Sequence, residues 1–236
     1  GYDAVDVDQA TLSNVKVTNT PDVLNDEVAD TAVALTLCVY KNISSANNFL
    51  LEKKWLKSEF PLSKKFSGTK FGILGMGRIG KTIAKRIEAF NCEICYHSRN
   101  EKDVKYKFFS KLEELAKYVD TLCVITPGGE ETKHLVNSNI LQKLGKNGFL
   151  INIARGSVID QQALIHALQN NIICGAGLDV FENEPNVPDN LMKLDNVILT
   201  PHIGSATVET RYDMGKLVYD NVVKMLTTNS TISPVN

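Results

Sequence analysis

One glycine-rich turn constrains the fold of this chain more than any other feature of its sequence. Residues 70–90, "KFGILGMGRIGKTIAKRIEAF", carry Gly75, Gly77 and Gly80 in the pattern G-x-G-x-x-G. Such a triplet can form a tight turn without a ligand, but this one joins a short apolar run to an amphipathic segment. There the first glycine permits the turn, the second lets a pyrophosphate approach the backbone, and the third allows close packing of helix on strand. The turn therefore predicts a βα unit whose helix N-terminus binds the phosphates of a dinucleotide.

Apolar runs and amphipathic segments alternate along most of the sequence. This alternation predicts an α/β fold, a doubly wound parallel sheet of the Rossmann type with helices on both faces. The expected strands are 15–18, 70–75, 92–97, 121–127, 148–154, 172–180 and 196–204. The expected helices are 25–40, about 43–57, 78–90, 110–119, 137–144, 160–171 and about 205–227. Ser110 with Glu113 predicts a capping box, and Asp160 is the expected N-cap of its helix.

The composition disfavours several classes of function. With 43% hydrophobic residues, 22% charged residues and a net charge of −1, the chain is typical of a globular protein that binds neither nucleic acid nor membranes. The apolar run from Thr31 to Tyr40 is shorter than the roughly 20 residues of a membrane span. No signal peptide or peroxisomal tail is recognisable, and the odd number of cysteines, 5, favours a reducing compartment. We therefore expect a cytoplasmic protein that acts on a small molecule.

Two of the cysteines, Cys92 and Cys95, form a C-x-x-C motif with His97 nearby. A zinc site would need a second ligand pair, and none stands at a suitable spacing. A redox motif would favour a helix N-terminus, whereas these residues alternate along an expected strand. We interpret them as buried or edge-strand thiols and predict no metal site.

The position that identifies the cofactor lacks its usual acid. A ribose with a free 2′-hydroxyl is held by Asp or Glu at the end of the second strand, about 20 residues along the chain. That position falls at His97 or Ser98, and Glu93 lies at the opposite end of the strand, about 13 Å away at ~3.3 Å per residue. The strand instead runs into Ser98 and Arg99, a hydroxyl and a guanidinium that suit a 2′-phosphate. The sequence therefore predicts NADP(H); the alternative is that Arg99 is only a solvated loop cation.

Three side chains of complementary chemistry follow predicted strands at their carboxyl ends, where open parallel sheets bind ligands. Arg155 lies in "ARGS", Glu184 in "FENEP" and His202 in "PHIG". Arg155 can bind the carboxylate of a 2-keto acid and polarise its keto oxygen. His202 can donate the proton that this oxygen takes up as hydride reaches the carbon, with Glu184 orienting the imidazole. The set therefore predicts hydride reduction of a 2-keto acid.

Each of these residues also has a simpler interpretation when it is taken alone. A loop arginine is usually a surface charge, "NEP" is ordinary turn chemistry, and an isolated loop histidine is often structural. Their positions beyond consecutive strand ends favour the functional interpretation. His166 falls in an amphipathic helix and His134 in a loop, so neither is a candidate. Asp179, at the end of the strand before Glu184, is expected to face the nicotinamide side of the site.

Five longer stretches carry a resemblance to a known family. They are "TNTPDVLNDEVADTAVAL", "GILGMGRIG", "INIARGSVIDQQAL", "GAGLDVFENEP" and "TPHIGSAT". Together they resemble the D-isomer-specific 2-hydroxyacid dehydrogenases, and they span nearly the whole chain. Within that family, "FSGTKFGILGMGRIG", "EAFNCEICYHSRN" and "HIGSATVETR" are most similar to the plant-type hydroxyphenylpyruvate and hydroxypyruvate (glyoxylate) reductases.

The resemblance implies residue roles, a cofactor and a partner. The implied catalytic set is Arg155, Glu184 and His202, and the implied substrate site is Gly1, Arg155 and His202. It also implies NADP(H) as the cofactor and a homodimer formed through the cofactor domain. The implied cofactor contacts are Arg78, Ile79, Pro127, Thr132, Ile153, Asp179, His202, Gly204 and Ser205, in addition to Gly75, Gly77, Gly80, Ser98 and Arg99.

The resemblance also implies two domains. Residues 21–202 would form the NAD(P)-binding Rossmann domain, and residues 1–20 and 203–236 the remnant of a flavodoxin-like substrate-binding domain whose N-terminal part is missing. The expected reaction is NADPH-dependent reduction of hydroxypyruvate, glyoxylate or hydroxyphenylpyruvate to the D-2-hydroxy acid. The alternative is an NADP-binding protein whose catalysis is impaired by the truncation. The missing ribose acid disfavours a third possibility, an NAD-dependent dehydrogenase of the phosphoglycerate type.

Overall fold

The structure is a computed structural model that describes residues 1–236. Its centre is a seven-stranded sheet in which all neighbouring strands pair in parallel, in the order β3-β2-β1-β4-β5-β6-β7. The strands are β1 (Lys70–Leu74), β2 (Glu93–His97), β3 (Lys107–Phe108), β4 (Thr121–Val124), β5 (Phe149–Asn152), β6 (Gly175–Leu178) and β7 (Val197–Leu199). The predicted doubly wound α/β fold is confirmed. Because the order reverses between β1 and β4, the ligand crevice is expected beyond the carboxyl ends of these strands.

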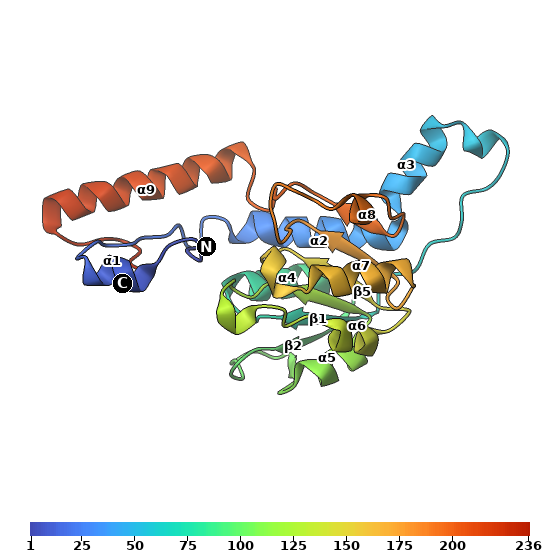
Figure 1. Cartoon of the computed structure of the whole chain (residues 1–236), viewed down its shortest axis with the longest axis horizontal. Helices are drawn as coiled ribbons and strands as arrows, with labels where there is room; N and C mark the ends of the chain where they lie inside the picture. Colours follow the sequence, from blue (N-terminus) through green and yellow to red (C-terminus); the bar gives the residue numbers. More distant parts are fainter.

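Helices cover both faces of the sheet (Figure 1). On one face, α2 (Asn25–Lys41) and α4 (Arg78–Glu88) contribute to a core cluster of 19 buried residues. On the other, α5 (Leu112–Tyr118), α6 (Ser138–Leu144) and α7 (Gln161–Gln169) contribute to a cluster of 25 buried residues. The shorter elements near the sheet are α8 (Asp189–Met192) and the 3₁₀ turns η2 (Glu130–Thr132) and η3 (Gly156–Val158). No helix combines the length and the apolar character that crossing a membrane requires.

Most of the expected elements are present with shorter ends, and Asp160 caps α7 as predicted, accepting a hydrogen bond from the backbone N–H of Ala163 at 2.9 Å. The prediction of a capping box at the start of α5 was wrong. The helix begins at Leu112 and Lys111 occupies the N-cap, so Ser110 lies one residue too early to cap it. The two-residue strand β3 at the edge of the sheet was not predicted.

Two further expectations from the sequence were wrong. Residues 15–18 do not form a strand, because only Thr18 makes a bridge, with Pro234. The helix expected over 43–57 is divided into α3 (Ile43–Leu51) and the 3₁₀ turn η1 (Lys54–Leu56). The division falls at Lys53, whose left-handed backbone, with φ of 56°, cannot continue a helix.

A second lobe contains α1 (Val7–Leu12), α9 (Val208–Thr228) and both ends of the chain, and lies to one side of the sheet (Figure 1). The buried residues of α9 are both polar, Thr210 and Asn221. The side-chain oxygen of Asn221 accepts hydrogen bonds from the backbone N–H groups of Ile232 and Ser233. These bonds fold the C-terminal residues back against α9.

The segment that begins with α3 projects from the sheet body (Figure 1). Six of its large apolar side chains are exposed, namely Ile43, Leu50, Leu51, Trp55, Leu56 and Leu62. Exposed apolar side chains gathered on one projecting segment are typical of a surface that binds another protein.

Candidate active site

The glycine turn between β1 and α4 has the shape that a pyrophosphate needs. Gly75 has a left-handed backbone with φ of 110°, and a Cβ there would lie 2.8 Å from the carbonyl oxygen of Ile125. A Cβ on Gly80 would overlap the carbonyl oxygen of Gly75. By contrast, a Cβ on Gly77 would meet nothing within 4 Å, so open space lies before the helix start. Because Gly77 is the N-cap of α4 and has no side chain to cap it, the first N–H groups of α4 face that space.

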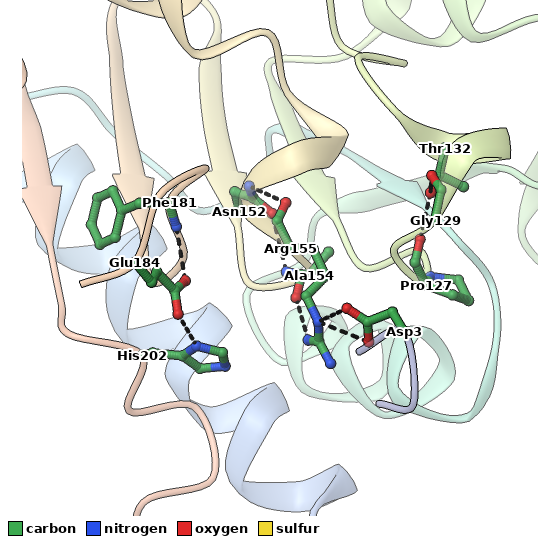
Figure 2. Close-up of polar contacts among 10 residues, drawn as sticks. All are labelled: Asp3, Pro127, Gly129, Thr132, Asn152, Ala154, Arg155, Phe181, Glu184 and His202. Atoms are coloured by element: carbon green, nitrogen blue, oxygen red, sulfur yellow. Dashed lines mark hydrogen bonds and ion pairs between the residues drawn. The ribbon is translucent and has the colours of Figure 1, made fainter. Parts of the chain in front are cut away.

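The chain that follows β4 provides a second feature suited to a polar ligand. Thr126 adjoins the turn, since its backbone nitrogen would lie 3.1 Å from a Cβ on Gly75. Its hydroxyl oxygen is buried and has no hydrogen-bond partner in the protein. The loop beyond is ordered by the hydroxyl of Thr132, which donates to the carbonyl oxygen of Pro127 at 2.8 Å (Figure 2). The turn and this loop together fit a dinucleotide.

The residues predicted to recognise a 2′-phosphate lie beside the turn but are exposed. β1 and β2 pair with Leu74 opposite His97, which places Ser98 and Arg99 next to the glycine turn. The guanidinium of Arg99 forms an ion pair with Glu131 at 3.1 Å, and the two side chains are 87% and 81% exposed. Such an exposed pair contributes little stability, so Arg99 is available to another anion. Arg78, a predicted cofactor contact, likewise pairs with Asp22 at the surface.

At the other end of the same edge, Glu184 and His202 form a hydrogen-bonded pair. The Nδ1 atom of His202 lies 2.6 Å from Oε2 of Glu184 (Figure 2). The second oxygen, Oε1, accepts a hydrogen bond from the backbone N–H of Phe181 at 3.0 Å. Both carboxylate oxygens are therefore held, and the imidazole keeps Nε2 for another partner.

The loop that carries His202 is tied to the end of β6 by Asp179, which is only 2% exposed. Oδ1 of Asp179 accepts from the hydroxyl of Thr200 and from the N–H of Ile203, and Oδ2 accepts from the N–H of Gly204. His202 donates its own N–H to the carbonyl oxygen of Asp179 and has a left-handed backbone with φ of 53°. A non-glycine residue keeps that conformation only where its surroundings enforce it. The carboxylate thus fixes the loop, and the predicted contact of Asp179 with nicotinamide stays a prediction.

Arg155 is oriented by an acidic partner that sequence reasoning did not find. Its Nε atom lies 2.9 Å from Oδ2 and 3.2 Å from Oδ1 of Asp3 (Figure 2). Its Nη1 donates to the carbonyl oxygen of Ala154, while Gly1 lies against the remaining nitrogen, Nη2. Burial acts to raise the pKa of Asp3, but the hydrogen bond and charge of Arg155, together with a backbone hydrogen bond, outweigh it and hold that pKa below its usual value. Asp3 precedes Arg155 by 152 residues, and no local pattern signals the contact.

One cavity of about 470 Å³ brings the three predicted catalytic residues together. Its lining is mostly polar and comes from the N-terminal segment, the loop after β5, the loop after β6 and the loop after β7. The lining residues are Asp3, Arg155, Gly156, Ser157, Phe181, Glu182, Asn183, Glu184 and His202. Two loops meet closely there, since a Cβ on Gly156 would overlap the backbone of Phe181. A guanidinium, a carboxylate and an imidazole therefore share one space beside the nucleotide crevice.

The remaining histidines and cysteines lie outside this cavity. His97 contacts the carbonyl oxygen of Phe109 through Nδ1. Cys95 is buried in β2, and burial with the nearby charge of Glu93 raises the pKa of its thiol to about 11. Burial likewise raises the pKa of Cys123 to about 12. Thiols in such settings are unreactive, and no cluster of potential ligands is arranged to hold a metal ion.

Comparison with known proteins gives a consistent set of relatives. Residues 33–204 match the model of the NAD binding domain of D-isomer specific 2-hydroxyacid dehydrogenases. Over the whole chain and 75% of the relative, the sequence is 45% identical to glyoxylate/hydroxypyruvate reductase A of Arabidopsis thaliana. With the same coverage it is 44% identical to hydroxyphenylpyruvate reductase of Plectranthus scutellarioides. The structure is similar, with a TM-score of 0.97 and 47% identity over 100% of this chain and 75% of the other, to NADPH-dependent glyoxylate/hydroxypyruvate reductase from Sinorhizobium meliloti in complex with NADP and malonate.

Proposed function

Because this chain belongs to the D-isomer-specific 2-hydroxyacid dehydrogenases, we propose that it reduces small 2-keto acids to D-2-hydroxy acids with NADPH. The substrates that we propose are hydroxypyruvate, glyoxylate and hydroxyphenylpyruvate, for which its relatives are named. The observation that carries the proposal is the 2.6 Å pair of His202 and Glu184, which lines the same cavity as Arg155.

His202 is the proposed proton donor. With Nδ1 bonded to Glu184, the ring has a fixed orientation and holds its transferable proton at Nε2. The negative carboxylate stabilises the charged imidazole before transfer, and the N–H of Phe181 keeps that carboxylate in place. NADPH, when bound over the glycine turn, would supply the hydride that the keto carbon accepts. His202 then delivers its proton to the keto oxygen.

Arg155 is the residue proposed to bind the substrate carboxylate. Its Nε and Nη1 are already bonded to Asp3 and to the carbonyl oxygen of Ala154. The Nη2 edge is left for the substrate carboxylate, beside Gly1, and a guanidinium there also polarises the keto oxygen. The polar lining of the cavity suits the carboxylate and keto groups that the three proposed substrates share.

The preference for NADPH rests on the end of β2. No carboxylate stands at the end of this strand, at His97 or Ser98, to hold a free 2′-hydroxyl, whereas Ser98 and Arg99 offer a hydroxyl and a cation. A 2′-phosphate carries more charge than Glu131 and would displace it from Arg99. The Sinorhizobium meliloti reductase, named as NADPH-dependent, is consistent with this preference.

We further propose the division into domains and a homodimer. Residues 21–202 would hold the cofactor, and residues 1–20 and 203–236 would contribute to the substrate-binding domain. The exposed apolar side chains of the segment from α3 to Leu62 support association of two cofactor domains through this segment. The five free thiols support a cytoplasmic location.

The test is a turnover assay in which NADPH consumption is followed by absorbance with each of the three keto acids. Binding of NADPH is measured in parallel by calorimetry on the same sample. Turnover with any of the three supports the proposal, and the ratio of kcat/KM with NADPH to that with NADH tests the cofactor preference. NADPH binding without turnover would instead support the alternative, a cofactor-binding protein without catalysis.

A further inference from the structure

A second histidine–glutamate pair lies beside the pair that carries the proposed function. Nε2 of His134 lies 2.7 Å from Oε1 of Glu182, and the side chains are 42% and 25% exposed. The pair of His202 and Glu184 has a similar separation but uses Nδ1 of the ring, and both histidines have a left-handed backbone, with φ of 51° for His134. Sequence reasoning assigned no role to His134 and did not single out Glu182.

The pair connects loops from three parts of the sheet edge. His134 follows η2, the 3₁₀ turn that ends at Thr132, and its N–H donates to the carbonyl oxygen of Ser157 at 2.9 Å. Ser157 lies two residues after Arg155 in the loop that follows β5. Glu182 lies in the loop after β6, and its N–H donates to Oε1 of Gln161, a residue of α7 that is 7% exposed. The cofactor-side loop and the loop after β6 are therefore joined through one bond between side chains.

The loop that Glu182 belongs to is the one that fixes the Glu184 carboxylate. Phe181, the preceding residue, donates its N–H to Oε1 of Glu184. Glu182 is thus anchored by His134 on its side chain and by Gln161 on its backbone, between the donor and the acceptor of that bond. An isolated ion pair at the surface would fix neither the side chain nor the backbone of Glu182.

We propose that His134 and Glu182 are positioning residues, which hold the 181–184 loop so that Glu184 stays bonded to His202. This inference rests on the proposed function, since it concerns the same site. Without the His134–Glu182 bond, Phe181 would stay packed in the core, but the chain beyond it would be held at Glu182 only by the backbone bond to Gln161. The Glu184 carboxylate, two residues further along, would then be placed less firmly between the N–H of Phe181 and His202. Small displacements of such groups lower the rate of a proton transfer steeply, because the transfer requires a short and aligned path.

The kinetic test compares two replacements of one residue. Glu182→Ala removes the bond to His134 and should lower kcat about 10-fold, with KM and the Kd for NADPH changed less than about 3-fold. Glu182→Gln keeps an oxygen acceptor for Nε2 of His134 and should restore kcat to within about 3-fold of the unchanged protein. The matched control is Asp189→Asn, which breaks an exposed ion pair with Lys193 and should alter none of these values.

Two outcomes of the kinetic test would overturn the proposal. A large rise in KM at constant kcat would make Glu182 a substrate contact rather than a positioning residue. In a protein that already carries Glu184→Gln, Glu182→Ala should have an effect below about 2-fold, because it acts through Glu184. A full 10-fold loss in that background would mean that the residue acts by another route.

A spectroscopic measurement tests the same bond without turnover. The chain has only 4 histidines, so the imidazole NMR signals can be assigned by replacing each in turn. Glu182→Ala should shift or broaden the Nδ1–H signal of His202, whereas Asp189→Asn should leave it unchanged. An unaltered His202 signal in Glu182→Ala would refute the inference. A wild-type protein that showed no turnover would instead count against the proposed function alone.

Discussion

The two ends of the sheet's carboxyl edge are built in different ways. Beyond β5, β6 and β7, polar groups are locked to one another, since Glu184 and Asp179 have both of their carboxylate oxygens hydrogen-bonded. Beyond β1 and β2, the turn offers open space at Gly77, and Arg99 is 87% exposed in a loose ion pair. One end fixes geometry, and the other provides room and charge.

This difference corresponds to the role that we propose for each end. Proton transfer depends on distance and alignment, so the groups that perform it must be held before the substrate arrives. Recognition of a phosphate depends on charge and on backbone N–H groups, which tolerate variation in side-chain position. Substitutions at the locked end should therefore affect kcat strongly, whereas those at the open end should affect cofactor affinity moderately.

The largest effect is expected for His202→Gln. This change removes the group that we propose as the proton donor but keeps the size of the side chain, so kcat should fall by about 100- to 10,000-fold. The Kd for NADPH, measured by calorimetry, should stay within about 2-fold because the glycine turn is untouched. An equal loss of rate and cofactor affinity would make His202 structural and would remove the contrast between the two ends.

Arg155→Lys comes next at the locked end. Lysine keeps the charge but cannot bond Asp3, the carbonyl oxygen of Ala154 and a substrate carboxylate together, as the guanidinium can. We expect kcat/KM for the keto acid to fall about 100-fold with NADPH affinity unchanged. A variant that retained full kcat/KM would show that a positive charge alone is enough to bind the substrate. Recognition beyond β5 would then depend on charge rather than on fixed geometry, as it does beyond β1 and β2.

At the open end, Arg99→Asp should exchange attraction for repulsion at the 2′-phosphate. The ratio of kcat/KM with NADPH to that with NADH should fall about 10- to 100-fold, while kcat with saturating cofactor stays near its original value. Arg211→Asp, a change of equal charge on α9, is the control and should leave the ratio unaltered. A fall in kcat as large as that in the ratio would contradict the separation of the two ends.

The smallest effect is expected for Glu131→Gln. This residue competes with a bound anion for Arg99, so its neutralisation should lower the Kd for NADPH about 2-fold. The Kd for NADH should not change, since that cofactor has no phosphate at this position. Equal tightening of both cofactors would mean that the effect is a general one of net charge rather than release of Arg99.

Sequence reasoning succeeded where the signal is local. The glycine turn, the strand "KFGILG" and the Asp160 cap are each specified within a few residues, and all are present. The capping box at Ser110 was wrong because the pattern allows more than one starting residue and the helix begins one residue later. The two residues of β3 are too few to show a periodicity.

Sequence reasoning paired Glu184 with His202 but did not find the contact of Asp3 with Arg155 or that of Glu182 with His134. Asp3 reaches Arg155 across 152 residues, and Glu182 reaches His134 across 48. Each of these contacts joins separate loops, and their meeting depends on the order of the strands in the sheet. The exposure of Arg99 and its pairing with Glu131 likewise depend on how two loops lie in space, which no local pattern specifies.

The loop from Thr200 to Thr207 is also a bridge between the sheet and the lobe that contains α9 (Figure 1). His202 lies at the near end of this bridge, where Asp179 fastens it to β6. If the lobe moves relative to the sheet to admit a substrate or to release a product, His202 is displaced least, because it lies at the end of the loop that is bonded to the sheet. The bond between His202 and Glu184 would then persist through the movement, and the change in backbone conformation would fall on residues nearer to α9.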